Sequence, residues 1–258
     1  MSITLRTVTA GTLADFSTYG RPLAWYQSLR AAGYSGVILN MWNAGWNTDA
    51  ATAWQAGLGV NLYQGWYGPA WDVMPDAISR AGAMVTAAHR IALPGGTPLG
   101  LDLEDVVGRT AVEMSQWITD WSGAIKQAGF AAALYVGANQ PLSSEQLYMA
   151  LPDVEHYWRS CSTVPDVYRR GYQLVQECGL TFEGWPIDRD TAGPDALGGT
   201  WRMAVQEASA ADPASSPAGT QDLSTIVADL TQHVSQLEAT IAKLASVQQA
   251  AGKVLSQG

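Results

Sequence analysis

The sequence predicts an α/β fold, a small (β/α)8 TIM-type barrel followed by a C-terminal coiled-coil helix. Three observations support this prediction. Short apolar runs alternate about eight times with segments of helical spacing over residues 1–207. These runs do not alternate between apolar and polar residues, which is typical of parallel strands covered on both faces. No glycine-rich loop has the spacing of a phosphate-binding motif, which argues against an open doubly wound sheet.

Strands are expected where short apolar runs lie between glycine, proline and polar residues. The first strand is expected to end near residues 12–17. The others are expected at residues 35–42, 58–66, 98–106, 130–138, 154–160 and 172–178, with a last strand at 184–188 or 201–207. Each run is short enough to form a single barrel strand.

Helices are expected at residues 21–33, 70–91 and 110–129, where apolar residues recur at helical spacing. The first and third of these segments end at a glycine, which commonly follows the last turn of a helix. A barrel of eight βα units in only about 205 residues is at the small end of the size range. We therefore expect several of its helices to be short or replaced by loops.

The chain divides into three regions by composition. Residues 1–207 carry the barrel pattern, residues 208–221 are a linker of small residues and proline, and residues 222–258 read as one helix. In this helix, apolar residues follow at alternating steps of four and three, the heptad spacing of a coiled coil. They are Leu223, Val227, Leu230, Val234, Leu237, Ile241 and Leu244. We expect a homo-oligomer, a dimer or a trimer; the alternative is a helix that folds back onto the barrel.

The charge balance argues against two classes of partner. The chain has 23 acidic and 14 basic residues and a formal net charge of −9, which would repel nucleic-acid phosphates and anionic membranes. No segment is long and apolar enough to cross a membrane, and no signal peptide is visible. We expect no nucleic-acid partner, no membrane insertion, and a location outside the cell or on a virion.

The cysteine and histidine residues give no sign of a metal site. The two cysteines, Cys161 and Cys178, lack metal-ligand spacing; they can pair if the protein is exported, and two free thiols fit the sequence equally well. His156 is interpreted as a residue of the core or the rim. We therefore expect neither a metal nor a cofactor.

Polar residues end several of the apolar runs. Asp15 ends the first run, Asn40 the second, Asp102 and Glu104 the fourth, and Asp188 the presumed last. Because side chains alternate along a strand, Asp102 and Glu104 point to the same face. The carboxyl ends of barrel strands meet at one mouth, where catalytic residues are found. Carboxylates that meet there repel one another, which raises at least one pKa and provides the protonated acid that glycosidic cleavage requires.

The aromatic composition indicates sugar binding. The chain has 11 Trp and 10 Tyr but only 3 Phe, and the flat faces of Trp and Tyr stack on sugar rings as well as in ordinary cores. Two clusters, at residues 41–47 and 65–71, follow apolar runs. The candidate substrate-binding residues are Asn40, Trp42, Trp66, Tyr67, Trp71, Tyr135 and Gln176, and Trp46 is a further candidate sugar platform. Burial in the core is the alternative for each tryptophan.

Three acidic segments carry a resemblance to a known family. Asp15 in LADFS, the D-x-E of LDLED and the late PIDRD resemble the acidic signature of the family-25 glycoside hydrolases, the lysozyme-like muramidases. The layout also resembles a related glycoside-hydrolase-like domain family of actinobacterial secreted proteins and phages. The resemblance covers residues 8–200 and leaves out the heptad region. It implies a barrel that hydrolyses bacterial cell-wall glycan.

The resemblance also implies roles for the acids. Glu104 corresponds to the general acid and Asp102 to its partner, which steers the N-acetyl group of the substrate or the charge at the anomeric centre. Asp15 and Asp188 would position the substrate or tune the pKa values of the other two. Where the family often has Asp-x-Asn, this chain has Asp188, Arg189 and Asp190, so the site acid is either Asp188 or Asp190.

Two functions from different classes fit the sequence. The first is a glycoside hydrolase whose partner is a cell-wall polysaccharide. The second is a catalytically inactive glycan-binding or structural module of a phage tail or virion surface, with other virion proteins as partners. Such a module would gain avidity from an oligomerising helix at residues 222–258.

Overall fold

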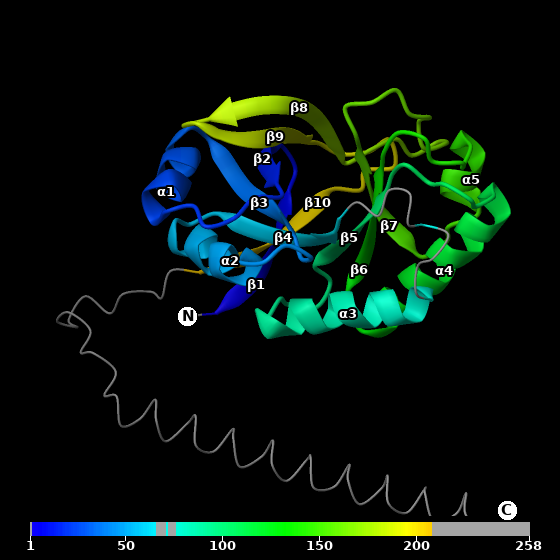
Figure 1. Ribbon diagram of the computed structural model, residues 1–258, viewed down its shortest axis with the longest axis horizontal. Coiled ribbons are helices and arrows are strands. Elements are labelled where there is room, and N and C mark those ends of the chain that lie inside the picture. Colours follow the sequence, from blue (N-terminus) through cyan, green and yellow to red (C-terminus); the bar gives the residue numbers. More distant parts are fainter. Residues whose placement is uncertain (1, 66–70, 72–75, 208–258) are drawn as a thin grey trace, which may run out of the picture. The chain divides into compact units, whose positions relative to one another are not determined.

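The computed structural model describes residues 2–65, 71 and 76–207. The predicted linker 208–221 and coiled coil 222–258 lie outside these residues. In the described part, eight strands form a closed barrel (Figure 1). They are β2 (Gly11–Phe16), β3 (Tyr34–Asn40), β4 (Gly59–Gln64), β5 (Pro98–Leu103), β6 (Ala131–Val136), β7 (Val154–Arg159), β8 (Leu174–Phe182) and β9 (Trp185–Ala192).

From β2 to β8, each strand pairs in parallel with the next strand along the chain, including β4 with β5. Strand β9 returns antiparallel between β8 and β2 and closes the barrel. The predicted α/β barrel is confirmed, but its last strand is reversed. The reason is the two-residue turn at Glu183 and Gly184, where φ is 46° and 79°. Positive φ at both positions favours a tight hairpin and leaves no chain for a crossover helix.

Two further strands lie outside the closed ring. Strands β1 (Ile3–Val8) and β10 (Trp201–Gln206) pair antiparallel along their full length, and β10 contacts the start of β4 through Ala204 and Val60. The sequence did not decide whether the last strand lies near residues 184–188 or near residues 201–207. The structure has a strand at both places, β9 and β10. Strand β1 was not predicted.

Five helices of the described chain follow β2 to β6 in turn. They are α1 (Leu23–Ala31), α2 (Trp46–Gln55), α3 (Ala77–Arg90), α4 (Ala111–Gln127) and α5 (Ser144–Met149). Between β7 and β9 the described residues form no helix, in line with the expectation that loops replace some helices. Side-chain caps start three of the helices, at Asp76, Thr110 and Ser143.

Large side chains fill the barrel interior. The side chain of Met203 of β10 packs against Gly36 of β3 and Gly59 of β4. Glycine at these positions makes room for it, since a Cβ on Gly36 would lie 2.2 Å from Met203 Cε. Nearer the mouth, the ring of Trp158 packs edge-on against Tyr135 and Tyr63, at centroid distances of 4.6 and 5.7 Å. These three rings line the bottom of the cavity at the carboxyl ends of the strands.

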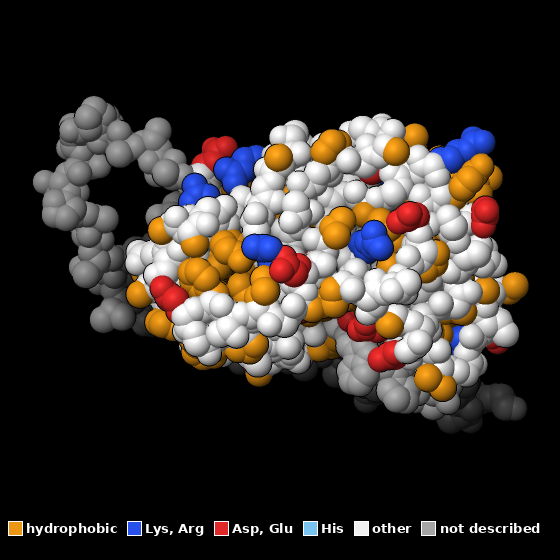
Figure 2. All heavy atoms as spheres, turned by 90° about the horizontal axis from the view of Figure 1, so that it is seen from above, with side chains coloured by type: hydrophobic (Ala, Val, Ile, Leu, Met, Phe, Trp, Pro, Cys, Tyr) orange, Lys and Arg blue, Asp and Glu red, His pale blue; other side chains and the backbone are white. Residues whose placement is uncertain are grey.

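The disulfide between Cys161 and Cys178 joins the loop after β7 to β8. This settles the choice between paired and free thiols that the sequence left open. Among the described residues, no helix has the length and apolar character needed to span a bilayer. On the face shown in Figure 2, the described lysine and arginine side chains are scattered and form no continuous basic patch.

Candidate active site

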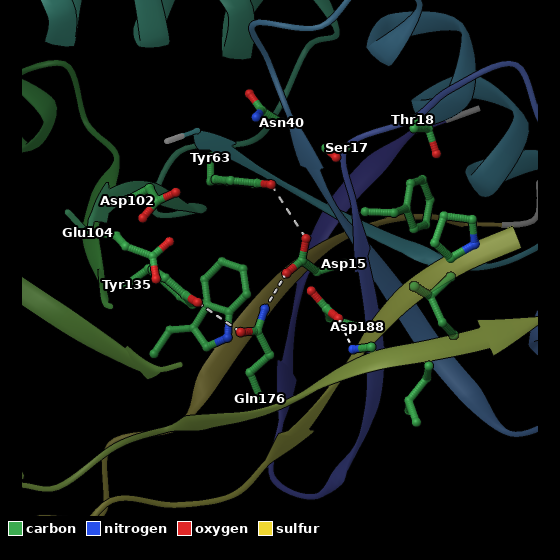
Figure 3. A pocket seen from close by; sticks show the side chains of 16 residues that line it. Asp15, Ser17, Thr18, Asn40, Tyr63, Asp102, Glu104, Tyr135, Gln176 and Asp188 are labelled. Carbon is green, nitrogen blue, oxygen red and sulfur yellow. Dashed lines mark hydrogen bonds between the residues drawn. The ribbon is translucent and has the colours of Figure 1, made fainter. Parts of the chain in front are cut away.

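A cavity of about 310 Å³ opens at the carboxyl ends of the barrel strands (Figure 3). The predicted acids Asp15, Asp102, Glu104 and Asp188 all line it. The other lining residues are Phe16, Ser17, Thr18, Asn40, Tyr63, Tyr135, Trp158, Gln176, Gly179, Leu180, Pro186 and Ile187. The structure thus brings together acids from β2, β5 and its following residue, and β9, which are far apart in the sequence.

Glu104 follows the last residue of β5, beside the end of β6. Its Oε1 accepts the backbone N–H of Ala138 at 3.3 Å. The neighbouring Gly137 allows this close approach, because a Cβ there would lie 2.5 Å from the Cβ of Glu104. Partial burial raises the pKa of Glu104, the charge of Asp105 adds to the rise, and the N–H of Ala138 opposes it. This environment favours a carboxyl group that keeps its proton, while Asp102 lies two residues earlier on the same face of the strand.

Asp15 is the most deeply held of the cavity acids, with 5% of its surface exposed. Its Oδ2 accepts the amide N–H of Gln176 at 2.6 Å, and the hydroxyl of Tyr135 donates to Gln176 Oε1 at 2.9 Å. The hydroxyl of Tyr63 lies 3.5 Å from Asp15 Oδ1. Burial raises the pKa of Asp15 to about 8, and the nearby charge of Asp188 adds to the rise. Burial therefore favours the protonated form of Asp15.

Asp188, and not Asp190, is the acid of β9 that lines the cavity. Asp188 pairs directly with Asp15 across the two antiparallel strands, and its Oδ1 accepts the backbone N–H of Gly179 at 2.7 Å. Partial burial raises the pKa of Asp188, and the Gly179 N–H opposes the shift. Asp190 is fully buried, and its Oδ1 accepts the indole N–H of Trp158 at 2.6 Å. Asp190 therefore supports the floor of the cavity.

Three of the tryptophans predicted as sugar platforms, Trp42, Trp46 and Trp71, do not line the cavity. Trp71 is 1% exposed, its indole N–H donates to the backbone oxygen of Glu104 at 2.8 Å, and its ring packs edge-on against Trp117. A buried ring has no free face for a sugar, so the role predicted for Trp71 is wrong. Trp46 is likewise buried in the core. Trp42 is 40% exposed outside the cavity, with the guanidinium of Arg80 4.8 Å from its ring.

Two of the predicted substrate-binding residues, Trp66 and Tyr67, lie outside the described residues. Asn40, Tyr135 and Gln176 do line the cavity. The position of Asn40 depends on Gly65, since a Cβ there would lie 1.8 Å from Asn40 Nδ2. The Oδ1 of Asn40 accepts the backbone N–H of Trp42 at 3.0 Å, so the amide is fixed at the end of β3.

Sequence reasoning missed Tyr63 and Trp158. Both residues lie inside apolar runs, and both line the cavity with their polar atoms turned toward Asp15 and Asp190. Their only sequence signal is a polar edge on an aromatic ring near the end of a strand. Among the described residues, no group of three His, Cys, Asp or Glu side chains is arranged to hold a metal ion.

The fold and the cavity define an α/β-barrel protein with an acid-lined mouth. No protein-family model matches the chain, and no curated protein sequence matches it. Among solved structures, the chain is similar to an uncharacterized B. stearothermophilus protein, with 16% identity, a TM-score of 0.53, and coverage of 74% of this chain and 99% of that chain. At this identity the likeness shows a shared fold.

Two further solved structures are similar over much of the barrel. The modular autolysin LytC from Streptococcus pneumoniae has 15% identity and a TM-score of 0.49, over 70% of this chain and 46% of that chain. A family 25 glycosyl hydrolase from Bacillus anthracis has 14% identity and a TM-score of 0.48, over 72% of this chain and 89% of that chain.

Proposed function

We propose that this chain is a glycoside hydrolase that cleaves bacterial cell-wall glycan, with Glu104 as the general acid. The observation that carries the proposal is the cavity itself, where Glu104, Asp102, Asp15 and Asp188 converge at the carboxyl ends of the strands. Hydrolysis of a glycosidic bond requires one protonated carboxyl group and a second, ionised one close by. The acidic signature described above gives the same assignment. As a cell-wall hydrolase the protein would act outside the cell or as part of a phage particle.

Glu104 is the acid best placed to protonate a leaving group. It is partly exposed at the cavity wall, whereas Asp15 is buried and accepts hydrogen bonds from Gln176 and Tyr63. The raised pKa of Glu104 keeps it protonated at higher pH than an ordinary glutamate. Its proton moves to the glycosidic oxygen as the bond from that oxygen to the anomeric carbon breaks. A water molecule then bonds to the anomeric carbon through its oxygen, and one of its protons restores the carboxyl group of Glu104.

Asp102 stabilises the charge that develops at the anomeric carbon or orients the N-acetyl group of the sugar. It is 6% exposed and lines the same cavity as Glu104. Asp15 acts as a positioning residue, because its bonds to Gln176 and Tyr63 fix three strands around the cavity. The raised pKa of Asp15 favours its neutral form, which limits the negative charge around Asp188.

The Glu104→Gln variant tests this function, with Glu145→Gln on the exposed surface of α5 as its matched control. Purified peptidoglycan is incubated with each protein, and the release of reducing sugar ends is measured. We expect Glu104→Gln to lose about 10²- to 10⁴-fold in rate, the range for removal of a general acid, and Glu145→Gln to match the native chain.

Two results would contradict the proposed function. Full activity of Glu104→Gln would remove this residue from the chemistry. Glycan binding without turnover, in the native chain and in Glu104→Gln alike, would identify a non-catalytic binding module.

A further inference from the structure

Two loops meet beside Glu104, and hydrogen bonds join them in both directions. The backbone N–H of Ala138 donates to Glu104 Oε1 at 3.3 Å, and the backbone oxygen of Ala138 accepts the N–H of Asp105 at 2.8 Å. The side-chain amide of Asn139 donates to Asp105 Oδ1 at 2.7 Å. The residues that follow β5 are therefore joined to those that follow β6.

Both loops turn at a residue other than glycine in the left-handed region. The φ angle is 49° at Asp105 and 56° at Asn139. Apart from glycine, aspartate and asparagine are among the residues that adopt this conformation most readily. Their side chains also form the hydrogen bond between the loops, which glycine could not do. The residue types at positions 105 and 139 thus suit both the turns and the contact.

Asp105 also acts on Glu104 through its charge. Partial burial raises the pKa of Glu104, the N–H of Ala138 lowers it, and the charge of Asp105 raises it. Arg109 lies further along the same loop, where its Nε donates to the backbone oxygen of Trp71 at 3.2 Å. The titratable groups that line the cavity beside Glu104 are Asp15, Tyr63, Asp102, Tyr135 and Asp188. Asp105 is not among them, so it adds negative charge near Glu104 from outside the cavity.

We propose that Asp105 and Asn139 form a clasp that positions the carboxyl group of Glu104 in the cavity. Neither side chain of the clasp lines the cavity, so both are positioning residues that act through Glu104. The link is Ala138, which contacts Asp105 through its oxygen and Glu104 through its N–H. This inference rests on the proposed function for the role of Glu104 as the general acid.

Two substitutions should move the titration of Glu104 in opposite directions. Asp105→Asn keeps an oxygen that can accept from Asn139 but removes the negative charge, so the pKa of Glu104 should fall. Asn139→Ala opens the clasp and withdraws the N–H of Ala138 from Glu104, so the pKa of Glu104 should rise. Both shifts are measured by NMR in the full chain with isotope-labelled glutamate, in which the signal absent from Glu104→Gln identifies Glu104.

Hydrolysis of peptidoglycan tests the effect on the reaction. A general acid must be protonated, so the rate falls as pH rises through the pKa of Glu104. In Asp105→Asn this fall should begin at lower pH, and above the native midpoint the rate should be roughly two- to fivefold below that of the native chain. Asn139→Ala should lose about tenfold at the native optimum, because a displacement of ~1 Å can cost about 10²-fold.

Asp120→Asn is the matched control. Asp120 also accepts from a side-chain amide, that of Gln116 at 2.8 Å, on the exposed surface of α4. This substitution should change neither the titration of Glu104 nor the pH profile of hydrolysis. Circular dichroism shows whether each variant is folded, and Asp105→Asn, which keeps the acceptor, tests the proposal even where Asn139→Ala does not fold.

The titration separates this inference from the proposed function, because it requires no catalysis. The clasp is overturned if either folded variant leaves the pKa of Glu104 unchanged, or if both move it in the same direction, even when the native chain cleaves peptidoglycan. Opposite shifts in a chain that cleaves no glycan would support the clasp and overturn the hydrolase. Opposite shifts in an active chain, with native rates in both variants, would overturn the positioning role.

Discussion

Glu104 and Asp15 show how one cavity holds two acids in different ways. Glu104 has one backbone donor and remains partly exposed, so it can meet a substrate. Asp15 accepts from two side chains and is almost fully buried. Burial raises the pKa of both groups, but only Glu104 combines a raised pKa with access. At the residue scale, the chemistry therefore depends on how closely the neighbours of Glu104 fix its position.

Gly137→Ala tests this dependence. The added Cβ would lie 2.5 Å from the Cβ of Glu104, so Glu104 has to move, and a displacement of about 1 Å can cost about 10²-fold in rate. We expect a loss of this order in peptidoglycan hydrolysis. Gly82→Ala is the matched control, because it adds the same methyl group to α3 where nothing lies within 4 Å. Equal rates for the two variants would show that the close packing at Gly137 does not position Glu104.

The pKa of Asp15 predicts a pH dependence of stability. An ordinary aspartate titrates at 3.8, whereas burial raises the pKa of Asp15 to about 8 in the folded chain. Between these values the folded state binds more protons than the unfolded state, so the free energy of unfolding falls as pH rises through this window. Asp15→Asn removes this contribution. Urea denaturation between about pH 5 and pH 8 should therefore show a smaller loss of stability with rising pH in Asp15→Asn than in the native chain.

Exposed Asp120→Asn is the control for this measurement, and it should follow the native curve. If the free energies of unfolding of Asp15→Asn and of the native chain differ by an amount that does not vary with pH, then Asp15 has an ordinary pKa in the folded protein. Burial lowers the pKa of His156 to about 3, which makes stability rise with pH up to about 6.5. His156 is present in all three proteins, so its effect cancels in the comparison.

At the scale of elements, the strands were more predictable from sequence than the connections. The run at residues 130–138 is apolar throughout, and the run at residues 98–106 is apolar up to Leu101, because both faces of the strands β5 and β6 that lie within them are buried. Helix α2 was missed because it starts at Gly45 without a side-chain cap, and α5 was missed because it has only 6 residues. The reversal of β9 depends on a two-residue turn, whose effect on direction does not appear in the hydrophobic pattern.

The candidate site was likewise only partly predictable from the sequence. Asp15, Asp102 and Glu104 could be found because acids at the ends of apolar runs are unusual and because parallel strands bring those ends together. Tyr63 and Trp158 could not, because an aromatic residue in an apolar run looks the same whether it packs in the core or turns its polar edge to a cavity. The same ambiguity led to the wrong role for Trp71.

The disulfide is the element-scale feature with the clearest test. Cys161 and Cys178 are exposed, and their bond ties the loop after β7 to the segment of β8 that holds Gln176 and Gly179. A loop with a sequence separation of 17 should contribute about 3 kcal/mol to the free energy of unfolding. We expect dithiothreitol to lower the urea midpoint of the native chain. The double variant Cys161→Ser, Cys178→Ser should have the lower midpoint with or without reductant, and a native chain insensitive to full reduction would contradict this.

Reduction should also affect the cavity. Gln176 donates to Asp15 and the backbone N–H of Gly179 donates to Asp188, so both contacts lie within two residues of Cys178. A reduced chain that stays folded should therefore hydrolyse glycan more slowly. Unchanged activity after complete reduction would show that the strand pairing of β8 with β9 holds these contacts without the disulfide.

At the scale of the whole molecule, we expect the barrel to hold the candidate site and the heptad region to self-associate. The barrel places its acids at one mouth. The first and last described residues lie side by side, since the N–H of Glu207 donates to the backbone oxygen of Ser2 at 3.0 Å. The heptad region contains none of the candidate site residues. If it self-associates, each assembly presents two or three mouths to one polymer, which slows release from a cell wall without any change in the chemistry.

Sedimentation tests this self-association. The full chain should sediment as a dimer or trimer, and a chain that ends at Glu207 as a monomer, because we expect another copy to cover the apolar seam at residues 223–244. Val234→Asp places a charge in that seam and should dissociate the full chain. Ser235→Asp, which adds the same charge one position outside the seam, should leave the assembly intact. A monomeric full chain, or equal masses for Val234→Asp and Ser235→Asp, would favour the alternative, a helix that folds back onto the barrel.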